Sequence, residues 1–158
     1  MINQTAALRA YSKFVCFCTS LLIFAGGMVT STGSGLAVPD WPLSYGSLFP
    51  PMVGGVFYEH GHRMIASFVG LLTLVQAVWL ARIEKRKWVK VLGFCALGAV
   101  ILQGLLGGIT VLFFLPTPVS VMHATLAQTF FVLTIVIAYS LSRERQQREG
   151  MPERVNKN

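Results

Sequence analysis

The chain has 158 residues, of which 54% are apolar and only 12% are charged. This balance excludes an ordinary soluble domain of this size and indicates a protein that lies in lipid. The formal net charge of +7 would by itself favour a nucleic-acid ligand, but the basic residues flank apolar runs, where membrane topology and anionic lipid account for them. We therefore expect membrane lipid, and no nucleic acid, as a partner.

Four apolar runs are long enough to cross a bilayer, which takes roughly 20 residues for a hydrocarbon layer about 30 Å thick. They predict helices over about 14–30, 60–81, 91–115 and 119–141. The first run could also belong to a signal peptide, but it is long for one, and cleavage would put the remaining spans out of register with the charge pattern. The expected fold is all-α, a single integral membrane four-helix bundle over residues 1–158.

Basic residues lie on one side of the predicted membrane. Because Lys and Arg near span ends stay on the cytoplasmic side, we expect a multi-pass protein of the cell membrane with both termini cytoplasmic and a cytoplasmic tail at 143–158. The basic residues on this side are Arg9, Lys13, Arg82, Lys85, Arg86, Lys87, Lys90, Arg143, Arg145, Arg148, Arg154 and Lys157.

One long connection, residues 31–58, joins the first two spans on the outer side. It has no Lys or Arg, and its many Gly and Pro residues exclude a continuous helix. The aromatic residues Trp41, Tyr45, Phe49 and Phe57 suit a head-group interface. A connection of this length and composition predicts a lid over the outer ends of the helices, with a solvated connector as the alternative.

Glycines and cysteines mark the other spans. Gly104 and Gly108, with Gly107 beside them, permit close approach of another helix or of a flat ligand, and helix packing is the favoured interpretation. Pro116 and Pro118 predict a tight outer turn between two antiparallel helices. The three cysteines, Cys16, Cys18 and Cys95, are expected near the inner ends of their helices as small buried apolar residues, because reducing conditions and an odd count argue against a disulfide.

Two histidines open two of the predicted helices. His62 begins the second span and His123 begins the fourth, so their imidazoles are expected at similar depth. Imidazole binds iron readily, and facing helices of a bundle are where cofactor sites are built. Together the pair predicts a haem placed edge-on between helices two and four, although either histidine alone is more typical of a packed residue. A zinc site would need further ligands, and only Glu59 and His60 are near.

Charged residues surround His62. With Asp40, the residues Glu59 and Arg63 carry all the formal charge on the outer side or within the membrane, where charge is costly and therefore indicates function. Their spacing places Glu59 on the face of His62 and lets Arg63 pair with Glu59; a surface ion pair is the alternative. Glu59 is a candidate orienting, proton-relaying or basic group, and Arg63 is a candidate partner for a haem propionate. His60 projects differently and is expected to be exposed or to bridge to the lid.

The sequence contains GGMVTSTGSGL at 26–36, PDWPL at 39–43, EHGHR at 59–63, LQGLLGGITV at 102–111 and HATLAQ at 123–128. These segments resemble the haem A synthase family, and the resemblance covers most of the chain from residue 26 to 131. The resemblance implies an oxidoreductase that converts a methyl group of haem O to a formyl group by successive hydroxylations, which supplies haem A to terminal oxidases. It also implies Glu59 as the catalytic carboxylate, His62 and His123 as the axial ligands of the haem iron, and Arg63 as a haem-binding residue.

The resemblance also implies partners. Members of the family usually have eight helices in two similar halves, each with a histidine pair, one taken as the haem O site and the other as a haem b site. This chain looks like the first half, so we expect a homo-oligomer, a dimer or higher, in which another copy supplies the second site. Haem O synthase and the terminal oxidase are further candidate partners. The alternatives are a bis-histidine b-type membrane cytochrome and a haem-carrying oxidase assembly factor, both without catalysis.

One departure from the family lies in the long connection. Many relatives carry a pair of cysteines that flanks the Pro-Asp-Trp-Pro segment, whereas Val38 and Ser44 occupy those positions here. A loop disulfide is therefore excluded.

Overall fold

The computed structural model describes residues 4–148 and 150, and these residues form five helices. The first four are long and apolar enough to cross a membrane, which confirms the expected all-α membrane fold. The helices are α1 (Gln4–Ser31), α2 (Gly55–Ile83), α3 (Lys87–Leu112), α4 (Thr117–Ser140) and the short α5 (Arg143–Arg148).

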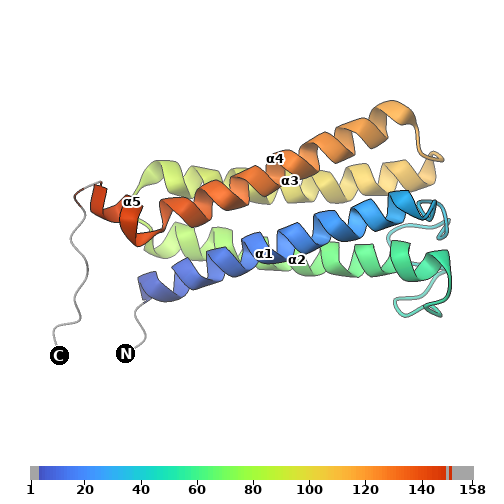
Figure 1. The fold of residues 1–158 in the computed structure, drawn as a ribbon, viewed down its shortest axis with the longest axis horizontal. Coiled ribbons are helices and arrows are strands. Elements are labelled where there is room, and N and C mark those ends of the chain that lie inside the picture. Colours follow the sequence, from blue (N-terminus) through green and yellow to red (C-terminus); the bar gives the residue numbers. More distant parts are fainter. Residues whose placement is uncertain (1–3, 149, 151–158) are drawn as a thin grey trace.

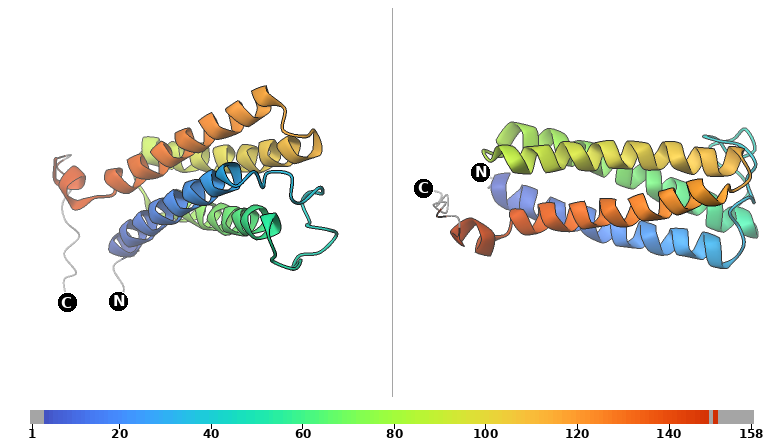
Figure 2. Two further views of the ribbon diagram at one scale, coloured as in Figure 1. Left: turned by 45° about the vertical axis from the view of Figure 1, so that its right-hand side comes forward. Right: turned by 90° about the horizontal axis from the view of Figure 1, so that it is seen from above.

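The four long helices form a closed ring. Each packs against two neighbours, in the order α1, α2, α3, α4 and back to α1, so that α2 lies diagonally opposite α4 (Figures 1 and 2). The segment 32–54 and the α3–α4 turn lie at one end of the bundle, which we call the loop end. The first turn of α1, the α2–α3 connection and α5 lie at the other end, which we call the basic end. Helices α2 and α4 therefore both start at the loop end.

The helices differ from the apolar runs mainly at their ends. Helix α1 begins at Gln4, about ten residues before the first run, and Arg9 ties this extension to the end of α4 by donating from Nε to the carbonyl of Leu141 at 2.7 Å. Helix α3 ends at Leu112 because Phe114 and Leu115 both adopt φ near 58°, before Pro116. Helix α5 lies in a stretch that was predicted only as a tail. Residues 149 and 151–158 of that tail lie outside the described residues.

The buried core brings together residues from all four long helices. Leu8 and Val15 of α1, Leu80 of α2, Val89 of α3 and Ile137 of α4 are almost completely buried in it. The helices also carry many exposed large apolar side chains, Phe24, Leu71 and Val132 among others, as expected of faces that meet lipid rather than water.

The cysteines are free, as expected, but they are not equally buried. Cys18 is buried and Cys16 is half-buried, whereas Cys95 is exposed. The expectation of burial was therefore wrong for Cys95. The α3 residues that face the core here are Gly93 and Ala96, and the helical repeat turns Cys95 away from them, toward the outer surface of the bundle.

Candidate functional site

The His62 imidazole lies in the bundle against helix α1. A Cβ atom added at Gly26 would lie 3.1 Å from Cε1 of His62, so glycine at this position leaves room for the ring. One turn earlier in α1, the backbone carbonyl of Leu22 interacts with the same imidazole. Helix α1 therefore forms a wall beside the ring of His62, with the carbonyl of Leu22 close to the imidazole.

The His123 imidazole has matching surroundings on the other side of the bundle. A Cβ atom added at Gly107 of α3 would lie 3.4 Å from Cε1 of His123, and the backbone carbonyl of Gln103, one turn away, interacts with the ring. The imidazoles of His62 and His123 are also close enough to interact electrostatically. The structure thus brings together, from diagonally opposite helices, the two histidines that the sequence singled out.

The donor set of this site suits a haem. The Nδ1 atoms of His62 and His123 are buried and have no hydrogen-bond partner in the part of the chain that the structure describes. A ligand histidine commonly has its second ring nitrogen oriented by a carbonyl, and the carbonyls of Leu22 and Gln103 are placed for that task. Two imidazoles from opposite sides, with no Cβ at Gly26 or Gly107, fit a flat macrocycle with an axial ligand on each face. Residues 4–148 contain no cluster of three or more His, Cys, Asp or Glu side chains that could hold a metal, which leaves the zinc alternative without a ligand set.

Glu59 and Arg63 form a buried ion pair at the start of α2. The pairing agrees with the spacing of four residues, but the side chains are only 4% and 14% exposed, so the surface alternative is wrong. The Oε1 atom of Glu59 is bound by Arg63, and Oε2 accepts the backbone N–H of Val38 at 2.7 Å. Both carboxylate oxygens are therefore engaged.

Arg63 also binds the backbone of the loop. Its guanidinium donates to the carbonyls of Asp40 at 2.7 Å, Leu43 at 2.9 Å and Val38 at 3.2 Å. One side chain of α2 thus holds three points of the segment 38–43, and a planar guanidinium can do so because it carries several donors in fixed directions.

His60 provides another attachment of the loop. It is buried, and its Nδ1 atom shares a 2.7 Å hydrogen bond with the hydroxyl of Ser44. Of the two possibilities left open for His60, exposure or a bridge to the loop, the structure gives the bridge. Val38 and Ser44 are both fully buried. In this chain both positions are held to α2 by hydrogen bonds with Glu59 and His60.

The loop also reaches α3. A Cβ atom added at Gly108 would lie 2.7 Å from Cδ2 of Trp41, so the indole lies directly on the helix backbone. The glycine spacing favours helix packing at Gly108, but the described contact of this residue is with an indole from the loop. Sequence reasoning missed this pair, and the only available signals were two consecutive glycines and an aromatic loop residue.

A tight turn between residues 40 and 46 shapes this part of the loop. The carboxylate of Asp40 accepts the backbone N–H groups of Tyr45 at 2.7 Å and Gly46 at 2.8 Å. The N–H of Gly46 above all, together with that of Tyr45, holds the pKa of the Asp40 carboxyl below its usual value. Tyr45 and Gly46 both have positive φ, of 53° and 68°, so the side-chain hydrogen bonds support a backbone that is strained at Tyr45.

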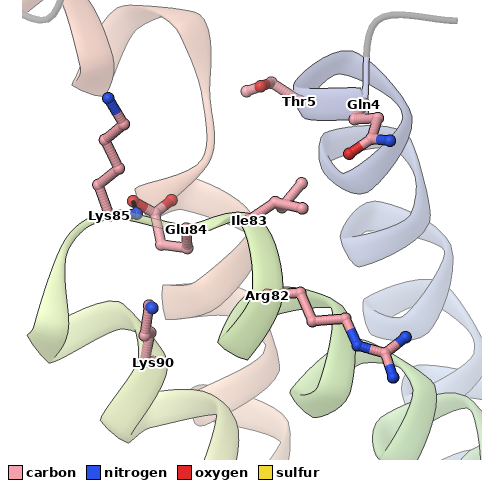
Figure 3. Close-up of a pocket in the computed structure, with 7 residues that line it drawn as sticks. All are labelled: Gln4, Thr5, Arg82, Ile83, Glu84, Lys85 and Lys90. Atoms are coloured by element: carbon pink, nitrogen blue, oxygen red, sulfur yellow. Dashed lines mark hydrogen bonds between the residues drawn. The ribbon is translucent and has the colours of Figure 1, made fainter.

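A polar hollow of about 500 Å³ lies at the opposite end of the molecule (Figure 3). It is formed by the first turn of α1 and the α2–α3 connection at the basic end, whereas His62 and His123 lie near the loop end. The hollow is therefore separate from the histidine site. Its lining residues are Gln4, Thr5, Arg82, Ile83, Glu84, Lys85 and Lys90.

Comparison with known proteins identifies the family. The sequence model of the cytochrome oxidase assembly protein family matches residues 9–54 and 52–158. The chain belongs to this family. Within the family, the chain is 32% identical over 154 residues to the haem A synthase of Exiguobacterium sibiricum, a match that covers 92% of this chain and 50% of that protein.

Two further relatives agree. The chain is 32% identical over 139 residues to the haem A synthase of Symbiobacterium thermophilum, covering 87% of this chain and 45% of the relative. It is 28% identical over 144 residues to that of Alkalihalophilus pseudofirmus, covering 87% and 48%. The chain spans about half the length of these relatives. No solved structure matches it.

The buried ion pair predicts a large effect of removing its cation. Arg63→Met leaves the Glu59 carboxylate buried without its partner, which typically costs about 3–5 kcal/mol. The matched control is Arg148→Met, because Arg148 pairs with Glu144 at the same spacing but both are about two-thirds exposed, and such pairs contribute less than about 1 kcal/mol. Thermal unfolding in detergent, followed by circular dichroism, measures the difference. Equal losses in the two variants would contradict the account of the pair.

The depressed pKa of Asp40 predicts a dependence of stability on pH. A carboxyl whose folded pKa is below its unfolded value, about 3.9, stabilises the fold above that value and loses this contribution as pH falls through the folded pKa. The apparent melting temperature of the wild type should therefore exceed that of Asp40→Asn by a constant margin above about pH 5. The margin should close below about pH 4. A margin that is unchanged down to about pH 3 would show that the carboxylate is not what stabilises the turn.

Proposed function

We propose that this chain is a haem A synthase unit that binds haem between His62 and His123 and oxidises a methyl group of haem O to a formyl group by successive hydroxylations. The observation that carries the proposal is that two imidazoles from diagonally opposite helices are close enough to interact electrostatically, and that each lies against a glycine, of α1 for His62 and of α3 for His123. The match to haem A synthases over 87–92% of the chain supports the choice of substrate.

The residues of the site have separate tasks in this proposal. His62 and His123 would hold the iron, and the carbonyls of Leu22 and Gln103 would orient their rings. The bound haem supplies the redox chemistry, with an external electron acceptor. Glu59 is the proposed catalytic carboxylate, and Arg63 pairs with it and fixes its position. The terminal nitrogens of Arg63 are used by Glu59 and the loop, so its Nε–H is the group that we assign to a haem propionate.

The setting of the unit is also part of the proposal. We place the chain in the cell membrane with both termini in the cytoplasm, because Lys and Arg gather at the basic end of the described bundle. We further propose a homo-oligomer, in which a second copy supplies the haem b site that the resemblance implies. Haem O synthase and the terminal oxidase are the proposed neighbours that deliver substrate and receive product. Native mass spectrometry from detergent would give the number of chains per complex, and a single chain in the active fraction would exclude the oligomer.

One observation favours a second candidate function, that of a b-type cytochrome or haem carrier without catalysis. Both oxygens of Glu59 are engaged, one by Arg63 and one by the N–H of Val38. A carboxylate held in this way has less freedom to act as a base than a free one. The two candidate functions share the histidine pair and differ in whether Glu59 takes part in a reaction.

Haem ligation is tested by three histidine variants. His62→Ala and His123→Ala should each abolish the low-spin bis-imidazole spectrum of the protein purified with haem, because each removes one axial ligand. His60→Ala is the matched control, since His60 is a buried neighbour of His62 that bonds to Ser44 instead. Visible and electron paramagnetic resonance spectra provide the measurement. A low-spin spectrum that survives in either of the first two variants would exclude the proposed ligand pair.

Catalysis is tested by haem analysis. Cells that supply haem O and express the wild-type chain should yield extracted haem A, and Glu59→Gln should abolish it while leaving the bis-imidazole spectrum intact. Chromatography of the extracted haems separates substrate, hydroxylated haem and product. A folded, haem-loaded wild type that yields neither modified haem, with a spectrum unchanged by Glu59→Gln, would establish the cytochrome instead.

A further inference from the structure

The indole of Trp41 lies beside the wall of the His123 site. Ring carbons Cδ2, Cε2 and Cε3 of Trp41 would lie 2.7, 2.9 and 3.0 Å from a Cβ atom at Gly108, so the fused part of the indole rests on the α3 backbone. The preceding residue, Gly107, is the one that accommodates the imidazole of His123. The side chains of His123 and Trp41 thus lie against two consecutive glycines of α3.

The loop backbone is held on both sides of Trp41. Arg63 donates to the carbonyl of Asp40, immediately before the indole, and to that of Leu43, two residues after it. Arg63 follows His62 directly in α2, so the same turn of helix presents one histidine of the site and fixes the loop that carries the indole. Trp41 is 38% exposed, which places it at the boundary between the bundle and its surroundings rather than in the core.

We propose that Trp41 is a positioning residue that closes the His62–His123 site at the loop end, seated on Gly108 and held by Arg63. The inference rests on the proposed function, because the group that Trp41 would cover is the haem. An indole supplies a large rigid apolar surface with few rotatable bonds, which suits it to exclude water from the edge of a macrocycle and to slow the escape of the haem. Glycine at 108 is required because even the methyl group of alanine would overlap the seated ring.

The contact between Trp41 and Gly108 can be disturbed without substituting a histidine. Gly108→Ala adds a methyl group where the indole lies, whereas Gly104→Ala, one turn earlier in α3, adds the same methyl group where nothing lies within 4 Å. This second variant is the matched control for helix propensity and for packing of α3. Trp41→Ala removes the indole directly, and Trp41→Phe retains an aromatic ring of smaller size.

Two measurements then test the proposal. In the haem-free protein labelled with 5-fluorotryptophan, the ¹⁹F resonance of Trp41, assigned by its loss in Trp41→Phe, should shift in Gly108→Ala and stay in place in Gly104→Ala. In the haem-loaded protein, transfer of haem to apomyoglobin should be faster by on the order of tenfold in Gly108→Ala and Trp41→Ala, as expected for the loss of one aromatic contact. Trp41→Phe should restore part of the difference, and the bis-imidazole spectrum should persist in every variant.

The outcomes distinguish a failure of the proposed role of Trp41 from a failure of the proposed haem site. Unchanged haem transfer in both Gly108→Ala and Trp41→Ala would overturn the role of Trp41 while leaving the haem site intact. A wild type that retains no haem would overturn both the proposed function and the role of Trp41 in closing the site. The ¹⁹F shift would then report only the contact between Trp41 and Gly108. Equally fast haem transfer in Gly104→Ala would also overturn the proposal, because the effect would then come from a change in α3 as a whole and not from the contact between Trp41 and Gly108.

Discussion

The diagonal placement of α2 and α4 is the constraint on which the site depends. Both helices start at the loop end, and His62 lies seven residues after the start of α2 while His123 lies six residues after the start of α4. At a rise of about 1.5 Å per residue, this puts the two imidazoles at nearly the same depth. Because α2 and α4 are diagonally opposite in a ring of four helices, these two side chains share the same interior space. Helices α1 and α3 contribute glycines there instead of larger residues.

A buried charge organises the surroundings of that space. Arg63 cannot be left without acceptors at the boundary of a membrane bundle, and its acceptors are Glu59 and three carbonyls of the loop. Satisfying the guanidinium therefore draws the loop down onto the ends of the helices. The cation that breaks the charge asymmetry of the sequence is thus the residue that fixes the loop. Glu59 belongs to the same network, so any catalytic task of this carboxylate is coupled to the position of the loop.

The sequence was sufficient for the spans and for the similar depth of His62 and His123, because both follow from local patterns. Apolar length identifies a spanning helix whatever it packs against, and the position of a histidine at a helix start sets its depth. Helix ends were less predictable: the extension of α1 depends on a contact between Arg9 and Leu141, which are distant in sequence. The exposure of Cys95 likewise depends on which face of α3 meets its neighbours.

The contacts between the loop and the helices could not be predicted from the sequence. Its composition excluded helix, but no periodicity relates Trp41 to Gly108 or Ser44 to His60, because both contacts depend on how the loop folds back onto the helices. The pairing of Glu59 with Arg63 was predictable because four residues of helix bring them together, whereas the bonds of Arg63 to the loop carbonyls required the fold. Gly26, whose contact with His62 shapes the site, lies within a family-like segment that did not by itself indicate this role.

The facing of His62 and His123 can be measured directly and without haem. In a chain whose three natural cysteines are replaced by serine, bismaleimidoethane should bridge the pair His62→Cys and His123→Cys within a single chain, which mass spectrometry detects as one bound reagent and no free thiol. The pair His60→Cys and His123→Cys should not be bridged, because His60 is engaged with Ser44 of the loop. The reverse pattern, with bridging of the His60 pair alone, would show that helices α2 and α4 do not present His62 and His123 to a common space.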